Sequence, residues 1–352
     1  MIRCGILTFQ YAHNYGALLQ AYALKTFLNN RGFDAEVINY ANQQAKEMYA
    51  FFPSKINGIV DFLRKGKRCV LRSRQYRLFK SFSRDYLGYA IENATEEKKS
   101  LSGKYYNIIV GSDQVWNKQL TNNDLTYFLE NIDCQRRISY AASFGSSKLI
   151  ESLDSKDVEL LSKFDFISVR ESDSQMKLQK IIKEKNISLV VDPVFLLNRE
   201  KWKEIERKPK SIKKKYCCLV MLRDDSELIS RCKAIASKMN TEIVSIHPMG
   251  WKQKCGRQLF DVGPLEFLWL IDHADFVVTN SFHATAFSAI FGKKVLTGAI
   301  AKDNDRISSL ISLLLGSNSH HGDDLIDTSC FDTKRLDEII VKSKEYLLKS
   351  LL

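Results

Sequence analysis

Short apolar runs alternate with amphipathic segments along most of the 352-residue chain. Residues 2–8 form the first run, and residues 17–30 follow with apolar side chains at helical spacing. Gly32 stands where a helix commonly ends, and residues 35–40 form the next run. A strand, a helix and a second strand in this order predict a parallel sheet with a right-handed crossover. The chain is therefore expected to be a doubly wound α/β protein.

The same alternation continues in two blocks, too long together for a single ordinary core. The first block has apolar runs at 106–110, 137–142, 166–169 and 188–191, and the second at 215–222, 242–246, 275–278 and 294–297. We expect two Rossmann-like lobes, residues 1–195 and 196–330, with a basic helical insertion at 55–100 in the first. Residues 331–352 are expected to form a C-terminal helix that packs back on the first lobe.

The net charge of +12 is concentrated in one segment. Nine basic residues and no acidic residue lie between Arg64 and Arg84, and Leu71, Leu78, Phe79 and Phe82 recur among them at helical spacing. This pattern predicts an amphipathic basic helix. Its charge either faces solvent or attracts anionic lipid or a diphosphate-linked acceptor. Nucleic acid is not expected as a partner, because no nucleic-acid-binding motif accompanies the charge.

Neither the cysteines nor the apolar runs indicate a metal site or a membrane span. The eight cysteines include no C-x-x-C pair, so we expect reduced thiols and no metal. No run approaches the roughly 20 apolar residues of a spanning helix, and the N-terminal run is too short for a signal peptide. A cytoplasmic protein is expected, with peripheral association at the inner membrane face left open.

Polar and small residues follow the expected strands where ligands bind in open parallel sheets. They are Asn14 to Gly16, Gly111 to Asp113, Ser143 to Gly145, Arg170, His247 and Asn280 to Thr285. Ser281, His283 and Thr285 also lie at the start of an expected helix. The free N–H groups and positive dipole end of such a helix favour an anion.

These segments carry a family resemblance. Six segments resemble the polysaccharide pyruvyl transferase family, and the matches appear in the family's order from residue 2 to about 315. The segments are residues 14–24, 111–117 (Gly-Ser-Asp-Gln-Val-Trp-Asn), 140–145, 168–171, Asp192-Pro193 and 279–285 (Thr-Asn-Ser-Phe-His-Ala-Thr). The two expected lobes resemble the GT-B-like arrangement of many glycosyltransferases. Ala284 replaces a glycine found in many relatives. Ser281 stands where other branches carry an arginine, so an arginine clamp would come from elsewhere in this chain.

The resemblance implies transfer of an enolpyruvyl unit from phosphoenolpyruvate to a sugar or a lipid-linked oligosaccharide, giving a pyruvate ketal without a further cofactor. His283 is expected to be catalytic, as an acid or as a cation against phosphate, because imidazole exchanges protons near neutral pH. Asp113 is the expected base. The expected donor-binding residues are Arg170, Arg306 (which follows the polar run 302–305), Ser281, Asn280 and Thr285; the expected acceptor-binding residues are Asn14, Tyr15, Gly16, Ser112, Gln114 and His247.

Other interpretations stay open. Arg170 would be an ordinary ion-pair residue if it paired with Glu171 or Asp173, and His247 could be structural. A nucleotide-sugar-dependent glycosyltransferase on the same fold would need an acidic residue for ribose, for which Glu266 is the candidate. A non-catalytic carbohydrate-binding assembly subunit is the other alternative. The sequence leaves the acceptor sugar and the oligomeric state open, with a homo-oligomer among the alternatives.

Overall fold

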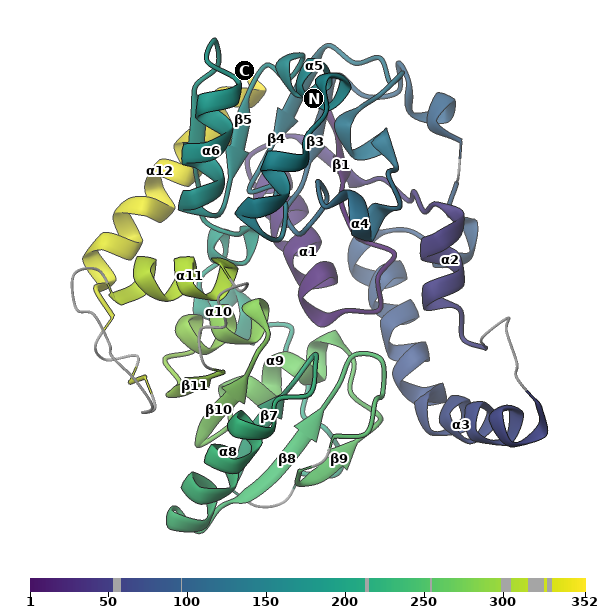
Figure 1. Ribbon diagram of the computed structural model, residues 1–352, viewed down its shortest axis with the longest axis vertical. Helices are drawn as coiled ribbons and strands as arrows, with labels where there is room; N and C mark the ends of the chain where they lie inside the picture. The colour runs from purple at the N-terminus through teal and green to yellow at the C-terminus, as the bar shows by residue number, and fades with distance from the viewer. Residues whose placement is uncertain are drawn as a thin grey trace.

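The chain forms two α/β lobes, one above the other in Figure 1. The computed structural model describes residues 1–52, 58–95, 97–212, 215–253, 255–298, 305–315, 326–327 and 331–352. Within these ranges no helix combines the length and apolar character needed to cross a bilayer.

The first lobe is built on a parallel sheet of strand order β2-β1-β3-β4. Single bridges from Ile138 to Phe166 and from Ala142 to Val169 continue this sheet toward a parallel pair, β5 and β6. The strands are β1 Arg3–Leu7, β2 Asp34–Val37, β3 Asn107–Val110, β4 Arg136–Ser139, β5 Ile167–Val169 and β6 Ile187–Leu189. Because β2 and β3 flank β1 on opposite sides, the chain reverses its direction across the sheet between β1 and β3.

The first helix, α1 (Tyr15–Asn29), follows β1 directly. It begins where the Asn14 side chain accepts hydrogen bonds from the backbone N–H groups of Gly16 and Ala17, which have no partner inside the helix. It ends before Gly32, whose φ of +84° is readily adopted only by glycine. The start of α1 is thereby held at the carboxyl end of β1.

The second lobe has a five-stranded parallel sheet of order β11-β10-β7-β8-β9. Here the chain reverses between β7 and β10. The strands are β7 Tyr216–Val220, β8 Glu242–Ile246, β9 Arg257–Leu259, β10 Phe276–Thr279 and β11 Val295–Thr297; the helices are α8 Ser226–Lys238, α9 Pro264–Asp272, α10 Phe282–Ile290 and α11 Asp305–Leu315.

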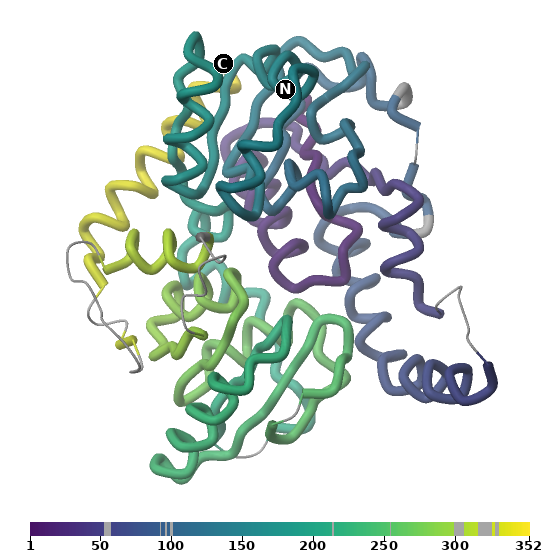
Figure 2. The backbone as a smooth tube through the Cα atoms, viewed as in Figure 1, coloured from purple at the N-terminus to yellow at the C-terminus, as the bar shows by residue number. Residues whose placement is uncertain are grey.

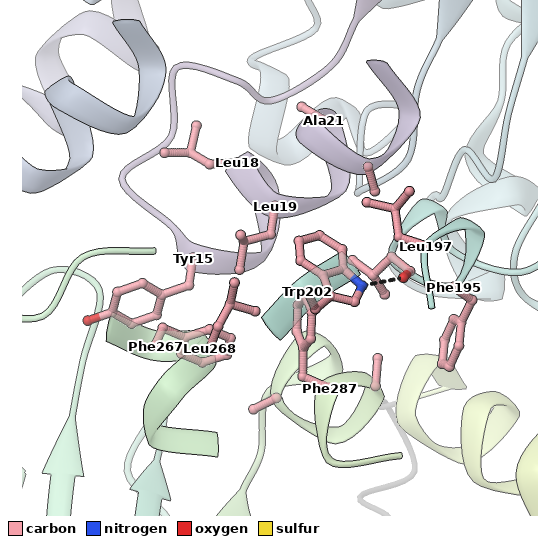
Figure 3. Packing of buried hydrophobic residues seen from close by; sticks show 14 of the residues in the cluster. Tyr15, Leu18, Leu19, Ala21, Phe195, Leu197, Trp202, Phe267, Leu268 and Phe287 are labelled. Carbon is pink, nitrogen blue, oxygen red and sulfur yellow. Dashed lines mark hydrogen bonds between the residues drawn. The ribbon is translucent and has the colours of Figure 1, made fainter. Parts of the chain in front are cut away.

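One continuous hydrophobic core joins the lobes, as Figure 3 shows. The ring of Tyr15 on α1 stacks on Phe267 of α9, with 4.8 Å between the centroids. Trp202 packs edge-on against Phe287 of α10 and donates from Nε1 to the Val194 carbonyl at 3.0 Å. Because these large apolar groups are fully buried, their packing holds α1 against the second lobe.

The basic segment forms α3 (Gly58–Phe82), which continues into a π-helical turn at Ser83–Leu87. Its buried face consists of Cys69, Arg72, Gln75, Phe79 and Phe82. Gln75 donates to both the Tyr15 hydroxyl and the His247 carbonyl, each at 2.9 Å, so α3 connects the two lobes. The expectation that Leu71 belongs to the apolar seam was wrong, because its side chain is 45% exposed.

The last helix, α12 (Thr333–Leu351), lies along the first lobe, as the yellow C-terminal trace in Figure 2 shows. Tyr346 donates to the Ser139 carbonyl at 3.1 Å, and Asn107 donates to the Leu351 carbonyl at 3.3 Å. The remaining helices are α2 Gln43–Tyr49, α4 Lys118–Thr121, α5 Ser155–Ser162, α6 Ser172–Ile181 and α7 Arg199–Lys203.

Candidate functional site

The two chain reversals face each other, and a cavity of about 190 Å³ lies between them. Ligands of open α/β sheets bind at the carboxyl ends of the strands beside such a reversal. The lining comes from the segments after β1, β3, β7 and β10, and from α11. Of the expected site residues, those that line this interlobe cavity are Asn14, Asp113, Gln114, Ser281, His283 and Arg306.

Helix α2 supplies a further wall of the interlobe cavity, which the sequence did not predict. Asn42 at its N-cap lines the cavity, together with Gln44, Met48 and Tyr49 of the helix itself. Burial and the charge of Asp113 raise the pKa of Tyr49 to about 12, so its phenol stays a hydrogen-bond donor at neutral pH. A seven-residue helix with no strong apolar pattern gave no signal of this role.

His283 lies in the first turn of α10, which is fixed by local hydrogen bonds. The Ser281 hydroxyl accepts from the Ala284 N–H, and the Thr279 hydroxyl accepts from the Ser281 N–H at 2.9 Å. The imidazole lies directly over Gly16: a Cβ atom there would be 2.1 Å from ring atoms Cγ and Nδ1. Gly16, which was expected to bind the acceptor, does not line the interlobe cavity, and its lack of a side chain leaves room for the His283 ring.

Asp192 is the charged partner of His283. Its Oδ2 lies 3.5 Å from His283 Nε2 and accepts hydrogen bonds from Ser112 Oγ and Arg170 Nη1, both at 2.7 Å. Burial alone would raise the pKa of this carboxyl, but His283, Arg170 and the Ser112 hydroxyl together hold it well below its usual range. Asp192 is therefore ionised and can orient the imidazole. In the sequence, Asp192 is recognisable only as part of the Asp192-Pro193 motif.

Arg170 is surrounded by acidic groups and does not line the interlobe cavity. Its Nε donates to Glu171 at 3.0 Å, and its guanidinium lies 4.2 Å from the centroid of the Phe282 ring. Burial would lower its pKa, but Glu171, Asp192 and Asp113 together raise it. Nη2 has no hydrogen-bond partner and lies 3.8 Å from Asp113 Oδ1. Arg170, expected to clamp the donor, thus lies in a buried ion pair in which two sides of its guanidinium fork bind protein groups.

Asp113 adopts a backbone conformation unusual for a residue with a side chain. Its φ is 78°, in the left-handed region, three residues after β3 ends at Val110. The Asp113 carbonyl accepts from the Ser143 N–H at 3.0 Å, and its Oδ1 accepts from the Gln114 N–H at 2.9 Å. Residues in such conformations cluster at functional sites, where surrounding contacts maintain the strain. Here the turn keeps the carboxylate at the cavity wall.

Arg306, at the start of α11, lines the interlobe cavity from the second lobe. Its Nε is buried and has no hydrogen-bond partner. Burial lowers its pKa, and the nearby charge of Arg170 lowers it further. An anion in the cavity would relieve both effects. Residues 302–304 of the polar run before it lie outside the described residues.

Four further residues expected at the site make contacts within the protein and do not line the interlobe cavity. Tyr15 is 2% exposed and packs between α3 and α9. Thr285 donates to the Ser281 carbonyl inside α10, and the Asn280 amide bonds the Leu222 N–H and the Arg223 carbonyl. Ser112 is fully buried behind the cavity, against Asp192.

His247 lines a separate cavity of about 440 Å³ beside α3, here called the second cavity. Its Nδ1 accepts from the Met249 N–H at 3.0 Å. Burial lowers its pKa to about 4, and the charges of Arg68 and Arg72 act in the same direction. His247 is therefore neutral at physiological pH and already hydrogen-bonded, which matches the structural interpretation of this residue.

Glu266, the acid weighed for ribose binding, has structural partners instead. It accepts from the Gly263 N–H at 3.0 Å and from Arg207 Nε at 2.6 Å, and so caps α9. Among the described residues, Glu206, Asp272 and His273 are close enough together to share a metal ion. Arg199 Nη2 and Lys203 Nζ lie 3.0 and 3.3 Å from the Asp272 carboxylate, so these cations compete with any metal there.

Comparisons with known proteins identify the sequence family and the fold. Residues 14–297 match the family model of polysaccharide pyruvyl transferase. No curated protein matches the sequence. A UDP-GlcNAc 2-epimerase from Methanocaldococcus jannaschii, solved with UDP-GlcNAc and UDP, shares 13% identity at a TM-score of 0.52, over 100% of this chain and 99% of that chain.

More distant structures include a Neisseria meningitidis UDP-GlcNAc 2-epimerase bound to UDP-GlcNAc, at 11% identity and a TM-score of 0.47, over 100% of this chain and 99% of that chain. An E. coli heptosyltransferase with ADP-2-deoxy-2-fluoro heptose has 11% identity and a TM-score of 0.37, over 96% and 99%. At this identity the M. jannaschii likeness bears on the fold alone. The expected fold of two Rossmann-like lobes in a GT-B-like arrangement is confirmed.

Proposed function

Because the chain belongs to the polysaccharide pyruvyl transferase family, we propose that it transfers a pyruvyl unit from phosphoenolpyruvate to a sugar of a polysaccharide precursor. The product is a pyruvate ketal bridging two sugar hydroxyls. The observation that carries the proposal is the pair of His283 and Asp192 beside the interlobe cavity, with the Asp113 carboxylate lining the same cavity. A protonated imidazole held by an ionised carboxylate is a suitable acid for carbon protonation.

The first step is protonation of the methylene carbon of phosphoenolpyruvate by His283. Because Nε2 faces Asp192, Nδ1 is the nitrogen assigned to deliver the proton. The substituted carbon becomes electrophilic, and an acceptor hydroxyl forms a C–O bond to it. Asp113 takes the proton of that hydroxyl.

In the second step the C–O bond to phosphate breaks, and a second sugar hydroxyl bonds to the same carbon. The proton of this hydroxyl leaves with the phosphate. The sugar thus gains a carbon that carries a methyl group and a carboxylate, and one phosphate is released. A proton returns from Asp113 to His283 through solvent before the next turnover. The residues supply positioning and proton transfer throughout.

Arg306 is the proposed clamp for the anionic donor, because its guanidinium lines the interlobe cavity and its Nε lacks a partner. Ser281 lines the same cavity at the N-terminus of α10, where the helix dipole favours an anion. Arg170 acts indirectly, because its charge and hydrogen bond keep Asp192 ionised and in place. It is therefore a positioning residue.

Asn14, Gln114 and Tyr49 are the proposed contacts for acceptor hydroxyls, since all three line the interlobe cavity. The acceptor is a sugar, free or carried on a lipid-linked oligosaccharide. Peripheral contact with an anionic membrane is proposed for the first turns of α3, where Ile59 and Val60 are 79% and 82% exposed beside a basic helix. Exposed apolar groups next to basic charge are typical of such contacts.

The test is a transfer assay with candidate acceptors, in which phosphate release is measured and the product is examined by mass spectrometry for the added ketal. His283→Asn should lower turnover by about 10²–10⁴-fold, since a positioned acid contributes that much. If His283 is chiefly an acid, the donor affinity of His283→Asn should change much less than its turnover. If His283 is chiefly a cation against phosphate, turnover and donor affinity should fall together. His273→Asn, on the far end of α9, serves as the matched control.

Three results would count against the proposal. Normal turnover in His283→Asn would remove the imidazole from the chemistry. The wild-type protein could release no phosphate with any acceptor, and a nucleotide sugar could raise its thermal stability where phosphoenolpyruvate does not. That combination would favour a glycosyltransferase. Stabilisation by an oligosaccharide alone, without turnover, would favour a carbohydrate-binding subunit.

A further inference from the structure

The second cavity lies next to the interlobe cavity. Met48, Tyr49 and Leu222 line both, so these three residues form the wall that the two cavities share. The remaining lining of the second cavity is strongly basic: Lys65, Arg68 and Arg72 come from α3, whereas Glu47 is its one acidic residue among those described. Lys65 pairs with Asp61, and Glu47 accepts a hydrogen bond from Gln43.

The two arginines carry charge that the protein does not neutralise. In both Arg68 and Arg72, Nε is buried and lacks a hydrogen-bond partner. No ion pair in the described part of the chain includes either residue. Burial lowers the pKa of both guanidinium groups, and the charge of Arg68 lowers that of Arg72 further. Buried charges are normally paired, because removing an unpaired ion from water is costly.

The position of these guanidinium groups is fixed by the fold. The stem of Arg72 packs over Gly250, where a Cβ atom would be only 2.5 Å from Arg72 Cγ. Arg68 donates from Nη2 to the Met249 carbonyl at 2.8 Å and lies 5.0 Å from the centroid of the Trp251 ring. The loop after β8 therefore holds both groups before any ligand arrives, which lowers the cost of binding.

We propose that the second cavity binds the diphosphate of a glycosyl diphosphate acceptor, whose sugar passes Tyr49 into the interlobe cavity. Two adjacent guanidinium groups with open donors match phosphate oxygens in charge and geometry. The assignment of the sugar end rests on the proposed function, whereas the anion site itself does not. The diphosphate can belong to a nucleoside diphosphate sugar or to a polyprenyl diphosphate sugar, which present the same group to the arginines.

Calorimetric titration with inorganic pyrophosphate tests the anion site without any turnover. Arg68→Met keeps an unbranched apolar side chain and removes the guanidinium that lies over Trp251, so the Kd should rise at least tenfold. The matched control is Arg77→Met, on the exposed side of α3 and outside the cavity, which should bind as the wild type does. If Arg68→Met does not fold, Arg68→Lys gives the same comparison, because it loses the planar fork. Equal affinity of the Arg68 variant and the wild type would overturn the proposal.

Kinetics then test the link to the interlobe cavity, with one sugar offered free, on uridine diphosphate and on a short polyprenyl diphosphate. Arg68→Met should raise the KM of at least one diphosphate acceptor tenfold relative to that of the free sugar. The acceptor with the larger effect identifies the source. The assignment of the second cavity to the acceptor diphosphate would be overturned if Arg68→Met raised the KM of the free sugar as much as that of the diphosphate acceptors. It would also be overturned if only the KM of phosphoenolpyruvate changed. If no acceptor is turned over while pyrophosphate binding depends on Arg68, the proposed function fails and the anion site stands.

Discussion

The contact between Gly16 and the His283 ring gives a sharp test of the active-site geometry. A Cβ atom at position 16 would lie 2.1 Å from the ring, whereas ordinary contact begins at 3.4 Å, so Gly16→Ala should displace the imidazole by about 1.3 Å. Misplacement by ~1 Å can cost about 10²-fold in rate. The displacement also changes the 3.5 Å separation of Nε2 from Asp192. We therefore expect turnover to fall about 100-fold, or ~2.7 kcal/mol in activation free energy.

The assay for Gly16→Ala is the initial rate of phosphate release at saturating donor and acceptor, with thermal unfolding measured in parallel. Position 16 lies in the first turn of α1, so alanine is compatible with its backbone. Gly66→Ala is the matched control, because Gly66 is also helical and a Cβ there meets nothing within 4 Å. Turnover within twofold of wild type in a folded Gly16→Ala protein would refute the assigned position of His283 in the chemistry.

Three further outcomes follow from buried or exposed groups. Asp192→Asn removes a carboxylate from a buried ion pair, so urea unfolding should show a loss of about 3 kcal/mol, as broken buried pairs typically do. His13 is buried with no partner for either ring nitrogen, and burial lowers its pKa to about 3 from an ordinary 6.5. Between pH 6.5 and pH 3 the His13 imidazole takes up a proton in the unfolded chain but not in the folded protein. The free energy of unfolding therefore falls as the pH falls, by ~2 kcal/mol from pH 6.5 to 5. When the free energy of unfolding is measured with urea at both pH values, His13→Phe should lose ~2 kcal/mol less than the wild type between pH 6.5 and 5. Phe79→Leu, the control, should lower the free energy of unfolding by the same amount at both pH values. Replacing Ile59 and Val60 with Asp should abolish sedimentation with anionic vesicles, and unchanged sedimentation would exclude this contact.

The strands and helices were largely predictable because each apolar run is short and ends in polar or small residues. The ends were less predictable, since they depend on individual backbone angles. The run 137–142 was expected to be one strand, but β4 stops at Ser139, and Ala141 adopts a φ of 56°. The strand β9 (Arg257–Leu259) was missed, because three residues without an apolar pattern carry no periodic signal.

The sequence segments that form the candidate site were predictable. Which of their side chains line the interlobe cavity, and which pair with other protein groups, was not. Strand-end motifs predicted that His283 and Asp113 would open onto one interlobe cleft, since ligands bind at the carboxyl ends of parallel strands and each residue follows such an end in its own lobe. The sequence could not show that Arg170 would turn toward Asp192, 22 residues later, instead of into the cavity. That choice depends on the burial of both groups, because a buried guanidinium needs acidic partners close by.

The basic helix α3 shows why charge counted along a sequence does not identify a binding surface. Its arginines look equivalent in the sequence, but Arg72 is 5% exposed and packs over Gly250, whereas Arg77 faces solvent. Reversing the charge of Arg72 would place a carboxylate inside the contact between α3 and the loop after β8, so lost vesicle binding in such a variant would report unfolding as readily as membrane contact. Membrane tests therefore need exposed positions, and anion tests need Arg68. The two roles proposed for α3 rest on residues in different turns of one helix, Ile59 and Val60 outside the second cavity and Arg68 and Arg72 in its lining, so each role can be removed without the other.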